Sequence, residues 1–310
     1  MSEEMDVIKC PIPPVDTLDG FTGLFGYPIA HSLSPLLHTT IYTALNLNWT
    51  YFPLSSTDIP GFLDLVRHSK CRGSGVTMPH KVAIIPYLDE LTDEGQAVGA
   101  CNTIVKRDGK LIGTNTDTIG VRESFLQNVA DPERAYHGRP GLVIGGGGAA
   151  RSAVYALVKL ECKIVYLVNR DPTEVAAVVA WCTAQGYGSG LRHVLTAAEA
   201  EGLEGPGAIV SCVPNFPPVT SAEVEARKVI EVLLAKPHKG AILEMCYHPT
   251  VYTEIGDLAQ RAGWQVILGT EAMLYQGFEQ VKYWTGREVK EMPIAATKDA
   301  IAAALRDGVA

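Results

Sequence analysis

One lysine stands where it could take part in chemistry. Lys81 follows the turn in "VTMPHK" and precedes the apolar run "VAIIPYL". Such a lysine is either a solvated decoration of a helix end or a group held at the mouth of a site. Polar side chains occupy similar strand-end positions nearby: Ser32, Ser34, Thr77, Asn102 and Asp117. Hydroxyls, an amide, an amine and a carboxylate together suit a small polyhydroxy acid as the ligand.

A glycine turn is the second chemical signal. "VIGGGGAAR" fits the pattern G-x-G-x-x-A with Gly145, Gly147 and Ala150, between an apolar strand pattern and a helix pattern. Such a turn lets the backbone approach a pyrophosphate, and the helix N-terminus supplies amides and partial positive charge. The alternative is a glycine turn that serves only close strand–helix packing.

A polar cluster, "NRD", follows the next apolar strand, where a selector for the cofactor ribose is expected. Arg170 could pair with a 2′-phosphate or stack on adenine. Asp171 could accept hydrogen bonds from ribose hydroxyls and would repel a 2′-phosphate. The acidic residue favours NAD over NADP as the cofactor.

The elements that position these residues follow from the hydrophobic pattern. In the first third, "GLFGYP" and "WTYFPL" are predicted strands, and Ser34 is the expected N-cap of a helix that begins at Pro35. Leu37, Ile41, Ala44 and Leu45 fall on one face of that helix. "TIVKRDGKLIGT" predicts a hairpin around Asp108-Gly109.

The later sequence alternates strands with helices. A helix is expected over residues 119–128, and "DPERAYHGRP" has the polar character of a linker. Apolar strands are expected in "GLVIG", "KIVYLV", "GAIVSCV", "GAILEMCY" and "WQVILG". Helices are expected after the glycine turn, in "TEVAAVVAWCTA" and in "VYTEIGDLAQRAG". This alternation predicts a doubly wound parallel sheet, completed by residue 268. A last helix is expected around residues 298–305.

Composition excludes several classes of protein. The chain has 310 residues, about the length of two ordinary domains, and a net charge of −8, which argues against general binding to nucleic acid or anionic membranes. Seven dispersed cysteines without a C-x-x-C pair indicate reduced thiols. No apolar segment reaches the length of a membrane span, no secretory signal is visible and no metal-ligand spacing occurs. We therefore expect a cytoplasmic protein.

Eight motifs, in order along nearly the whole chain, resemble the shikimate/quinate dehydrogenases. They are "HSLSP", "VTMPHK", "AVGACNTIV", "GTNTDTIG", "GGGGAAR", "VNRD", "EMCYHP" and "MLYQGFEQVKYWTG". The resemblance implies an α/β protein of two domains. Residues 1–118, completed by C-terminal helices at 271–310, would form a substrate-binding domain. Residues 119–270 would form a Rossmann-like cofactor domain, with the active site in the cleft between them.

The resemblance also assigns roles to residues. Ser32 and Ser34 would bind the substrate carboxylate. Thr77, Asn102 and Gln276 would hold ring hydroxyls, and Tyr247 would line the carboxylate side. Lys81 and Asp117 would be catalytic and flank the hydroxyl that is oxidised. The cofactor-binding residues would be Gly145, Gly146, Gly147, Gly148, Ala149, Asn169, Arg170, Asp171 and, at the nicotinamide, Gly269.

Three positions depart from the family's common pattern. Gly75 replaces the asparagine that usually precedes "VT", which could leave room for the additional C1 hydroxyl of quinate. Glu244 stands where aspartate is more usual. "NRD" replaces the "NRT" of NADP-using biosynthetic members and supports NAD. His31, His38 and His80 are expected in packing or loop hydrogen bonds, and Tyr275, Tyr283 and Trp284 in the core.

The resulting hypothesis is an NAD-dependent dehydrogenase of quinate or shikimate, a monomer or homodimer. Oxidation of a secondary alcohol removes a proton as well as a hydride, and Lys81 would take the proton. Because a neighbouring carboxylate stabilises a charged amine, Asp117 fits best as an orienting partner. The alternatives are an NADP-dependent shikimate dehydrogenase of aromatic amino-acid biosynthesis and, in another class, a non-catalytic quinate sensor.

Overall fold

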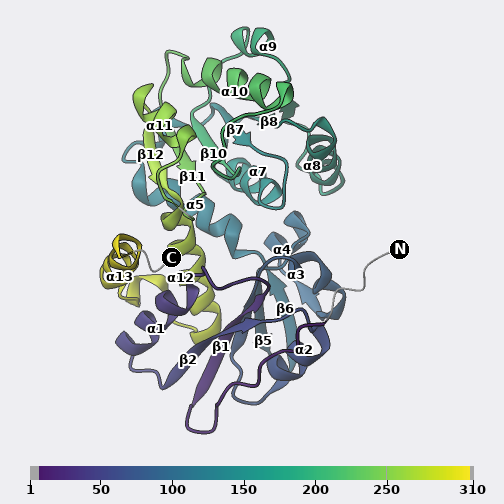
Figure 1. Ribbon diagram of the computed structural model, residues 1–310, viewed down its shortest axis with the longest axis vertical. Coiled ribbons are helices and arrows are strands. Elements are labelled where there is room, and N and C mark those ends of the chain that lie inside the picture. Colours follow the sequence, from purple (N-terminus) through teal and green to yellow (C-terminus); the bar gives the residue numbers. More distant parts are fainter. Residues whose placement is uncertain (1–6, 249, 308–310) are drawn as a thin grey trace. The chain divides into compact units, whose positions relative to one another are not determined.

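The computed structural model describes residues 7–248 and 250–307 (Figure 1). The chain divides into two compact units. Unit 1 contains the described residues up to Thr116 and those from Gln276 onward, and unit 2 is Asp117–Tyr275. The boundaries thus fall after residues 116 and 275, where the sequence suggested 118 and 270.

Unit 1 is built on a six-stranded mixed sheet with the order β2-β1-β3-β5-β6-β4. Its strands are β1 (Gly20–Gly26), β2 (Trp49–Ser55), β3 (Gly73–Val76), β4 (Glu90–Leu91), β5 (Thr103–Arg107) and β6 (Lys110–Thr114). Its helices are α1 (Ser34–Ala44), α2 (Ile59–Arg67), α3 (His80–Ala83), α4 (Asp93–Val98) and α13 (Ile294–Arg306), with short 3-10 turns at Ile85–Tyr87 and Val289–Glu291. The first three strands run parallel, and β5 and β6 are antiparallel neighbours.

The predicted hairpin is confirmed. β5 and β6 pair as antiparallel strands, and the turn residues Asp108 and Gly109 have φ values of 52° and 78°. A two-residue turn with both φ values positive matches the right-handed twist of the strands, which is why the Asp-Gly pair is a strong hairpin signal.

Two details of α1 differ from expectation. Leu33 is the N-cap and makes no side-chain capping bond, so the assignment of Ser34 as the cap is wrong. The hydroxyl of Ser32 instead accepts a hydrogen bond from the Ser34 amide at 3.2 Å. Ala44, which was expected on the apolar face of the helix, is exposed. His38, which was not expected on that face, is fully buried.

Unit 2 is a parallel sheet of six strands in the order β12-β11-β10-β7-β8-β9. The strands are β7 (Pro140–Ile144), β8 (Ile164–Val168), β9 (Leu191–His193), β10 (Ala208–Ser211), β11 (Ala241–Glu244) and β12 (Gln265–Leu268). The helices are α5 (Thr116–Asn128), α6 (Pro132–Ala135), α7 (Ala150–Lys159), α8 (Pro172–Ala184), α9 (Ala197–Glu201), α10 (Ser221–Leu234) and α11 (Glu254–Arg261), and α12 (Gly269–Thr285) continues into unit 1. The doubly wound sheet is confirmed, and its order reverses direction at β7, where such folds bind ligands.

The segment that resembled a linker belongs to unit 2. It contains α6, and Tyr136 is buried beside Phe125, with their ring centroids 5.7 Å apart. The polar composition of the segment comes from its exposed residues, and one aromatic side chain fixes it to the core of unit 2.

Two hydrophobic clusters make the core of unit 2, and a third lies in unit 1 between strands and α2. All seven cysteines are free thiols. Within the described residues, no helix combines the length and hydropathy needed to cross a bilayer.

Candidate active site

Backbone hydrogen bonds bring several polar residues of unit 1 together at the end of β3. The Val76 amide donates to the Asn102 carbonyl at 2.7 Å, and the Cys101 amide donates to the Lys81 carbonyl at 2.7 Å. Thr77 follows β3 directly. The segments that carry Thr77, Lys81 and Asn102 are therefore adjacent, as a shared site requires.

The Asn102 amide is held tightly. Its Oδ1 accepts from the Thr116 backbone amide at 2.7 Å, and its Nδ2 donates to Thr116 Oγ1 at 3.0 Å. Thr116 Oγ1 in turn donates to Gln276 Oε1 at 3.2 Å. The two amides assigned to ring hydroxyls thus meet at one threonine, which the sequence did not single out although it directly precedes Asp117.

Ser32 lies on the loop between β1 and α1, and Ser34 is the first residue of α1, beside Tyr51 of β2. Burial raises the pKa of Tyr51, and the neighbouring Ser34 side chain partly offsets that effect. A Cβ built on Gly75 would lie 2.9 Å from the Tyr51 hydroxyl and 3.3 Å from Leu24 Cδ1. The space beside Gly75 is therefore filled by Tyr51, and the idea that this glycine leaves room for another hydroxyl is wrong.

Three histidines of unit 1, those expected in packing or loop hydrogen bonds, occupy different environments. His80 is buried, stacks on Phe25 at 4.3 Å and lies 3.1 Å from the Ser56 carbonyl through Nε2. It fixes the turn that carries Lys81, which confirms a packing role. His38 is also buried, and burial lowers its pKa to about 3. His31 is exposed.

In unit 2, Asp117 lies near Tyr247. Burial raises the pKa of Tyr247, and the negative charge of Asp117 raises it further. Asp117 is half-buried in the first turn of α5. A carboxylate and a phenol are thus adjacent on the segments that follow β6 and β11.

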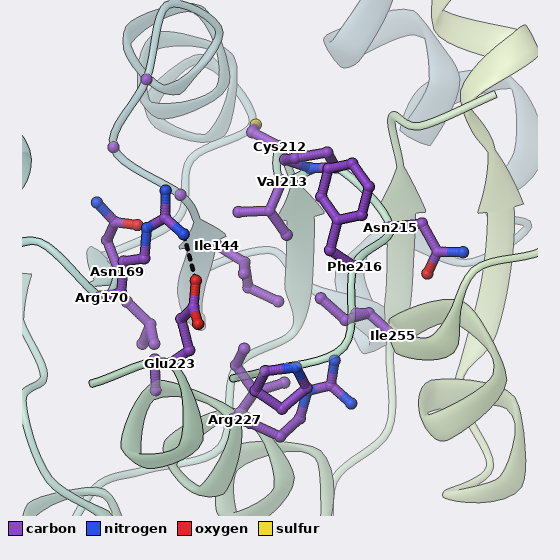
Figure 2. Close-up of a pocket in the computed structure, with 18 of the residues that line it drawn as sticks. Ile144, Asn169, Arg170, Cys212, Val213, Asn215, Phe216, Glu223, Arg227 and Ile255 are labelled. Atoms are coloured by element: carbon purple, nitrogen blue, oxygen red, sulfur yellow. Dashed lines mark hydrogen bonds and ion pairs between the residues drawn. The ribbon is translucent and has the colours of Figure 1, made fainter. Parts of the chain in front are cut away.

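A cavity of about 550 Å³ opens at the carboxyl ends of the strands of unit 2 (Figure 2). Of the nine residues expected at the cofactor, five line it: Gly145, Gly146, Gly147, Asn169 and Arg170. Gly148, Ala149, Asp171 and Gly269 are not among the lining residues. Gly148 and Ala149 continue the glycine turn into α7, and Gly269 begins α12 against the Met245 carbonyl.

The glycine turn has the geometry of an anion cradle. Gly145 has φ 118°, which side chains other than hydrogen rarely tolerate. A Cβ on Gly147 or Gly148 would meet no other atom within 4 Å, so open space lies against these two residues. They lead into α7, whose N-terminal amides can receive a pyrophosphate. These residues fit a dinucleotide.

The charged groups at the cavity differ from the expected selector. Asp171 is the N-cap of α8, and its Oδ1 accepts from the Thr173 amide at 2.8 Å. Figure 2 shows Arg170 joined to Glu223 of α10, with Asn169 beside them. Hydrogen bonds from the Thr220 and Val219 amides, and then from Arg170, lower the pKa of Glu223 to about 2.

Glu223 is an acidic residue of the cavity that the sequence analysis did not identify as a site residue. It is the N3 residue of a capping box with Thr220, a pattern that signals a helix start and nothing about a cofactor. It lies far from the glycine turn in the sequence, and only the winding of the sheet brings α10 to β8.

Glu244 lies at the base of the same cavity, at the end of β11. It is 1% exposed, accepts from Thr253 Oγ1 at 3.0 Å and from the Cys246 amide at 3.2 Å. Burial raises its pKa to about 6, and these hydrogen bonds limit the rise.

Comparisons with known proteins agree with this geometry. Residues 24–104 match the shikimate dehydrogenase substrate binding domain. The chain is 46% identical over 305 residues to the quinate dehydrogenase of Emericella nidulans, and the match covers 91% of this chain and 93% of that protein. It is 36% identical over 266 residues to the pentafunctional AROM polypeptide of Komagataella phaffii, covering 85% of this chain and 17% of that polypeptide.

Solved structures give the same result. The shikimate dehydrogenase of Mycobacterium tuberculosis superimposes with a TM-score of 0.73 at 31% identity, covering 92% of this chain and 99% of that one. The shikimate 5-dehydrogenase of Thermus thermophilus, solved with NADP(H) and shikimate, gives 0.74 at 27% identity with the same coverage.

Proposed function

Because the chain belongs to the shikimate/quinate dehydrogenase family, we propose that it catalyses the reversible, NAD-dependent oxidation of quinate and shikimate to their 3-dehydro acids. The substrate class rests on one observation above the others, the match to a quinate dehydrogenase over 305 residues. The grouping of Thr77, Asn102 and Gln276 in unit 1 supports it, because hydroxyl and amide groups complement the hydroxyls of a cyclic acid.

We assign the substrate contacts as follows. Ser32 and Ser34, at the start of α1, bind the carboxylate, with Tyr247 on the same side. Thr77, Asn102 and Gln276 hold ring hydroxyls. The hydroxyl and amide groups of these three side chains can both donate and accept hydrogen bonds. They therefore suit the hydroxyl groups of the substrate better than a second carboxylate.

Lys81 is the proposed acid–base residue. A bound NAD⁺ would supply the acceptor for the hydride that leaves the carbon bearing the reacting hydroxyl. Lys81 takes the proton of that hydroxyl through its amine and, as an ammonium, returns it in the reverse direction. Asp117 is the second residue to which we assign a catalytic role.

The cofactor lies, in this proposal, on the glycine turn from Gly145 to Ala149, with Gly269 near the nicotinamide. Asn169 and Arg170 flank its adenosine ribose. We infer that Glu223 replaces Asp171 as the selector.

The preference for NAD over NADP depends on the ion pair between Arg170 and Glu223. An arginine that faces a 2′-phosphate must offer its charge to that phosphate. Here the Arg170 guanidinium is already paired with the Glu223 carboxylate. The low pKa of Glu223 keeps that carboxylate ionised at neutral pH. An ionised carboxylate accepts hydrogen bonds from ribose hydroxyls and repels a phosphate.

Initial rates for two acids and two cofactors test the proposal directly. We expect quinate and shikimate to be oxidised with NAD⁺, and NADP⁺ to be a poor substitute. Turnover only with NADP⁺ would instead identify the biosynthetic shikimate dehydrogenase. Binding of quinate without any oxidation would identify the sensor.

Glu223→Gln tests the selector. Without the carboxylate, Arg170 can turn toward a 2′-phosphate, so kcat/KM for NADP⁺ relative to NAD⁺ should rise on the order of tenfold, the value of about 1.4 kcal/mol. Glu225→Gln, on the same helix, is the matched control and should leave the ratio unchanged. An unchanged ratio in Glu223→Gln would remove Glu223 from the selector role.

We further propose that the enzyme acts in the cytoplasm as a monomer or homodimer. Seven free thiols are consistent with a reducing compartment.

A further inference from the structure

A chain of buried polar side chains lies on one face of the sheet of unit 1, where α1 and α12 pack. We name it the buried amide network, and all but one of its members are buried, Gln276 being partly exposed. Its members are His38, Gln280, Thr103, Asn102, Thr116 and Gln276. It joins two residues proposed to hold the substrate, Asn102 and Gln276, to residues with no assigned role.

From His38 to Asn102, each residue of the network donates a hydrogen bond to the next. His38 Nε2 donates to Gln280 Oε1 at 3.0 Å, and Gln280 Nε2 donates to Thr103 Oγ1 at 2.9 Å. Because the Thr103 hydroxyl accepts this bond, it uses its own hydrogen for Asn102 Oδ1 at 2.8 Å. Asn102 Nδ2 then donates to Thr116 Oγ1. The Thr116 hydroxyl lies 3.2 Å from three acceptors for its one hydrogen, which are Gln276 Oε1, Asn102 Oδ1 and Thr103 Oγ1.

The Thr116 backbone amide can only donate, so it fixes the carbonyl end of Asn102. Asn102 Oδ1 accepts two bonds from inside the network, one from Thr103 and one from the Thr116 amide. Its nitrogen is therefore the end that donates to Thr116 Oγ1. Asparagine and glutamine can otherwise flip at little cost, because their two ends have nearly the same shape.

His38 sets the start of the chain. Its pKa of about 3, lowered by burial, keeps the ring neutral, so it carries one proton, and the bond to Gln280 places that proton on Nε2. Its ring stacks on Tyr51 with centroids 4.2 Å apart and planes at 11°. Its other nitrogen, Nδ1, is buried and has no hydrogen-bond partner among the described residues. A buried nitrogen without a partner costs stability, so an apolar side chain would pack here at lower cost.

We propose that His38, Gln280 and Thr103 are positioning residues that hold the amides of Asn102 and Gln276 in the one orientation that binds the ring hydroxyls of the substrate. The inference rests on the proposed function, since it concerns how the same site recognises its acid. It extends that function to residues that make no substrate contact.

Gln280→Met tests the network. Methionine is close to glutamine in size but cannot donate to Thr103, so the Thr103 hydroxyl is no longer directed at Asn102. We expect Kd for quinate by calorimetry, and KM for quinate and shikimate, to rise on the order of tenfold, the value of one or two hydrogen bonds. Kd for NAD⁺ should not change, and kcat should change less than KM.

Thr103→Val/Gln280→Met separates positioning from stability. Replacing both partners of a buried hydrogen bond by apolar groups of similar shape can be nearly neutral for folding. The double variant should therefore be at least as stable as Gln280→Met and still bind quinate about tenfold more weakly than wild type. It also keeps the test open if Gln280→Met does not fold.

Tyr42→Phe is the matched control. It removes a buried hydroxyl, bonded to Thr22 at 2.7 Å, from the same unit and outside the network. Its Kd for quinate should equal that of wild type. Wild-type Kd in both network variants, with only their stability reduced, would overturn the inference and leave a structural role.

The same measurements keep the two proposals apart. A wild-type protein that binds quinate without oxidising it contradicts the proposed function, and the effect of Gln280→Met on Kd still decides the inference. A wild-type protein that oxidises quinate, with an unaffected Kd in the variants, contradicts only the inference.

Discussion

Lys81 illustrates how neighbouring residues position one side chain. It lies in a four-residue helix, α3, directly after the buried His80, and its carbonyl accepts from Cys101, the residue before Asn102. The packing of His80 on Phe25 and the bond to Cys101 hold the backbone at position 81 from both sides. The amine is thus carried by a fixed backbone, as a proton-transfer group requires.

Replacing Lys81 by alanine should lower kcat by roughly 10²- to 10⁴-fold, the usual contribution of general acid–base catalysis. The affinity for NAD⁺, measured by fluorescence titration, should stay near the wild-type value. Lys110→Ala is the control and should retain full activity. It removes a lysine of the β5–β6 hairpin that is paired with Glu90 of β4. Wild-type turnover in Lys81→Ala would mean that another group transfers the proton.

Glu244 predicts a pH dependence of folding. Its pKa is about 6 in the folded protein and near 4.5 in an exposed reference, so between these values the folded state binds more protons than the unfolded state. Stability should therefore fall as pH rises from 4.5 to 6. A shift of 1.5 units corresponds to about 2 kcal/mol.

Glu244→Gln removes this titration and keeps one oxygen, which can still accept from the Cys246 amide, while its amide nitrogen can donate to Thr253 Oγ1. The difference in unfolding free energy between the variant and wild type, from urea denaturation, should move in favour of the variant by about 2 kcal/mol between pH 4.5 and pH 7. Parallel stability curves across that range would show that the buried carboxyl does not titrate there.

At the scale of elements, two glycines of the same turn have different roles, one in folding and the other in cofactor binding. Gly145 needs its positive φ, and a Cβ there would lie 3.2 Å from Val213. Gly147 faces open space, so a Cβ there would meet a bound dinucleotide before it met the protein.

Gly145→Ala should lower the free energy of unfolding by about 1–3 kcal/mol, the cost of a residue held in an unfavourable backbone region. Gly147→Ala should leave stability within about 0.5 kcal/mol of wild type. It should, however, raise Kd for NAD⁺ on the order of tenfold. Thermal denaturation and calorimetric titration of both variants check this, and a Gly147→Ala protein with normal NAD⁺ affinity would show that the pyrophosphate binds elsewhere.

For the whole molecule, the proposed function assigns each ligand to one of the two units. In the proposed function, the dinucleotide contacts unit 2 through the glycine turn, and the acid contacts unit 1 through the start of α1.

Hydrogen exchange should reveal that division. NAD⁺ alone should slow exchange at the start of α7 and in the loop after β10, residues 212–216. Quinate alone should slow exchange at the start of α1. The turn of the β5–β6 hairpin should be unaffected by either ligand and is the internal control. Quinate that protects α7 and leaves α1 unchanged would contradict the assignment of the acid to unit 1.

The sequence by itself determined the local features of this protein. Asp108-Gly109 predicted the hairpin because only certain residues adopt two successive positive φ values, and alternating apolar segments predicted the parallel sheet of unit 2. The glycine turn was predicted together with its strand and helix, since all three are continuous in the chain. The strand β9 and the helix α10 were missed, as was the burial of Tyr136.

The tertiary structure decided what distant residues do together. Asp171 is the ribose selector expected from its position in the sequence, and it also caps α8. The acidic group paired with Arg170 is Glu223 on another helix, and no local pattern in the sequence predicts that pair. Gly75 suggested an open space that Tyr51 of a neighbouring strand fills, and the network from His38 to Gln276 joins α1, β5 and α12. Hydrogen bonds and packing act over a few ångströms in space, and residues far apart in the chain reach that distance only after the sheets have formed.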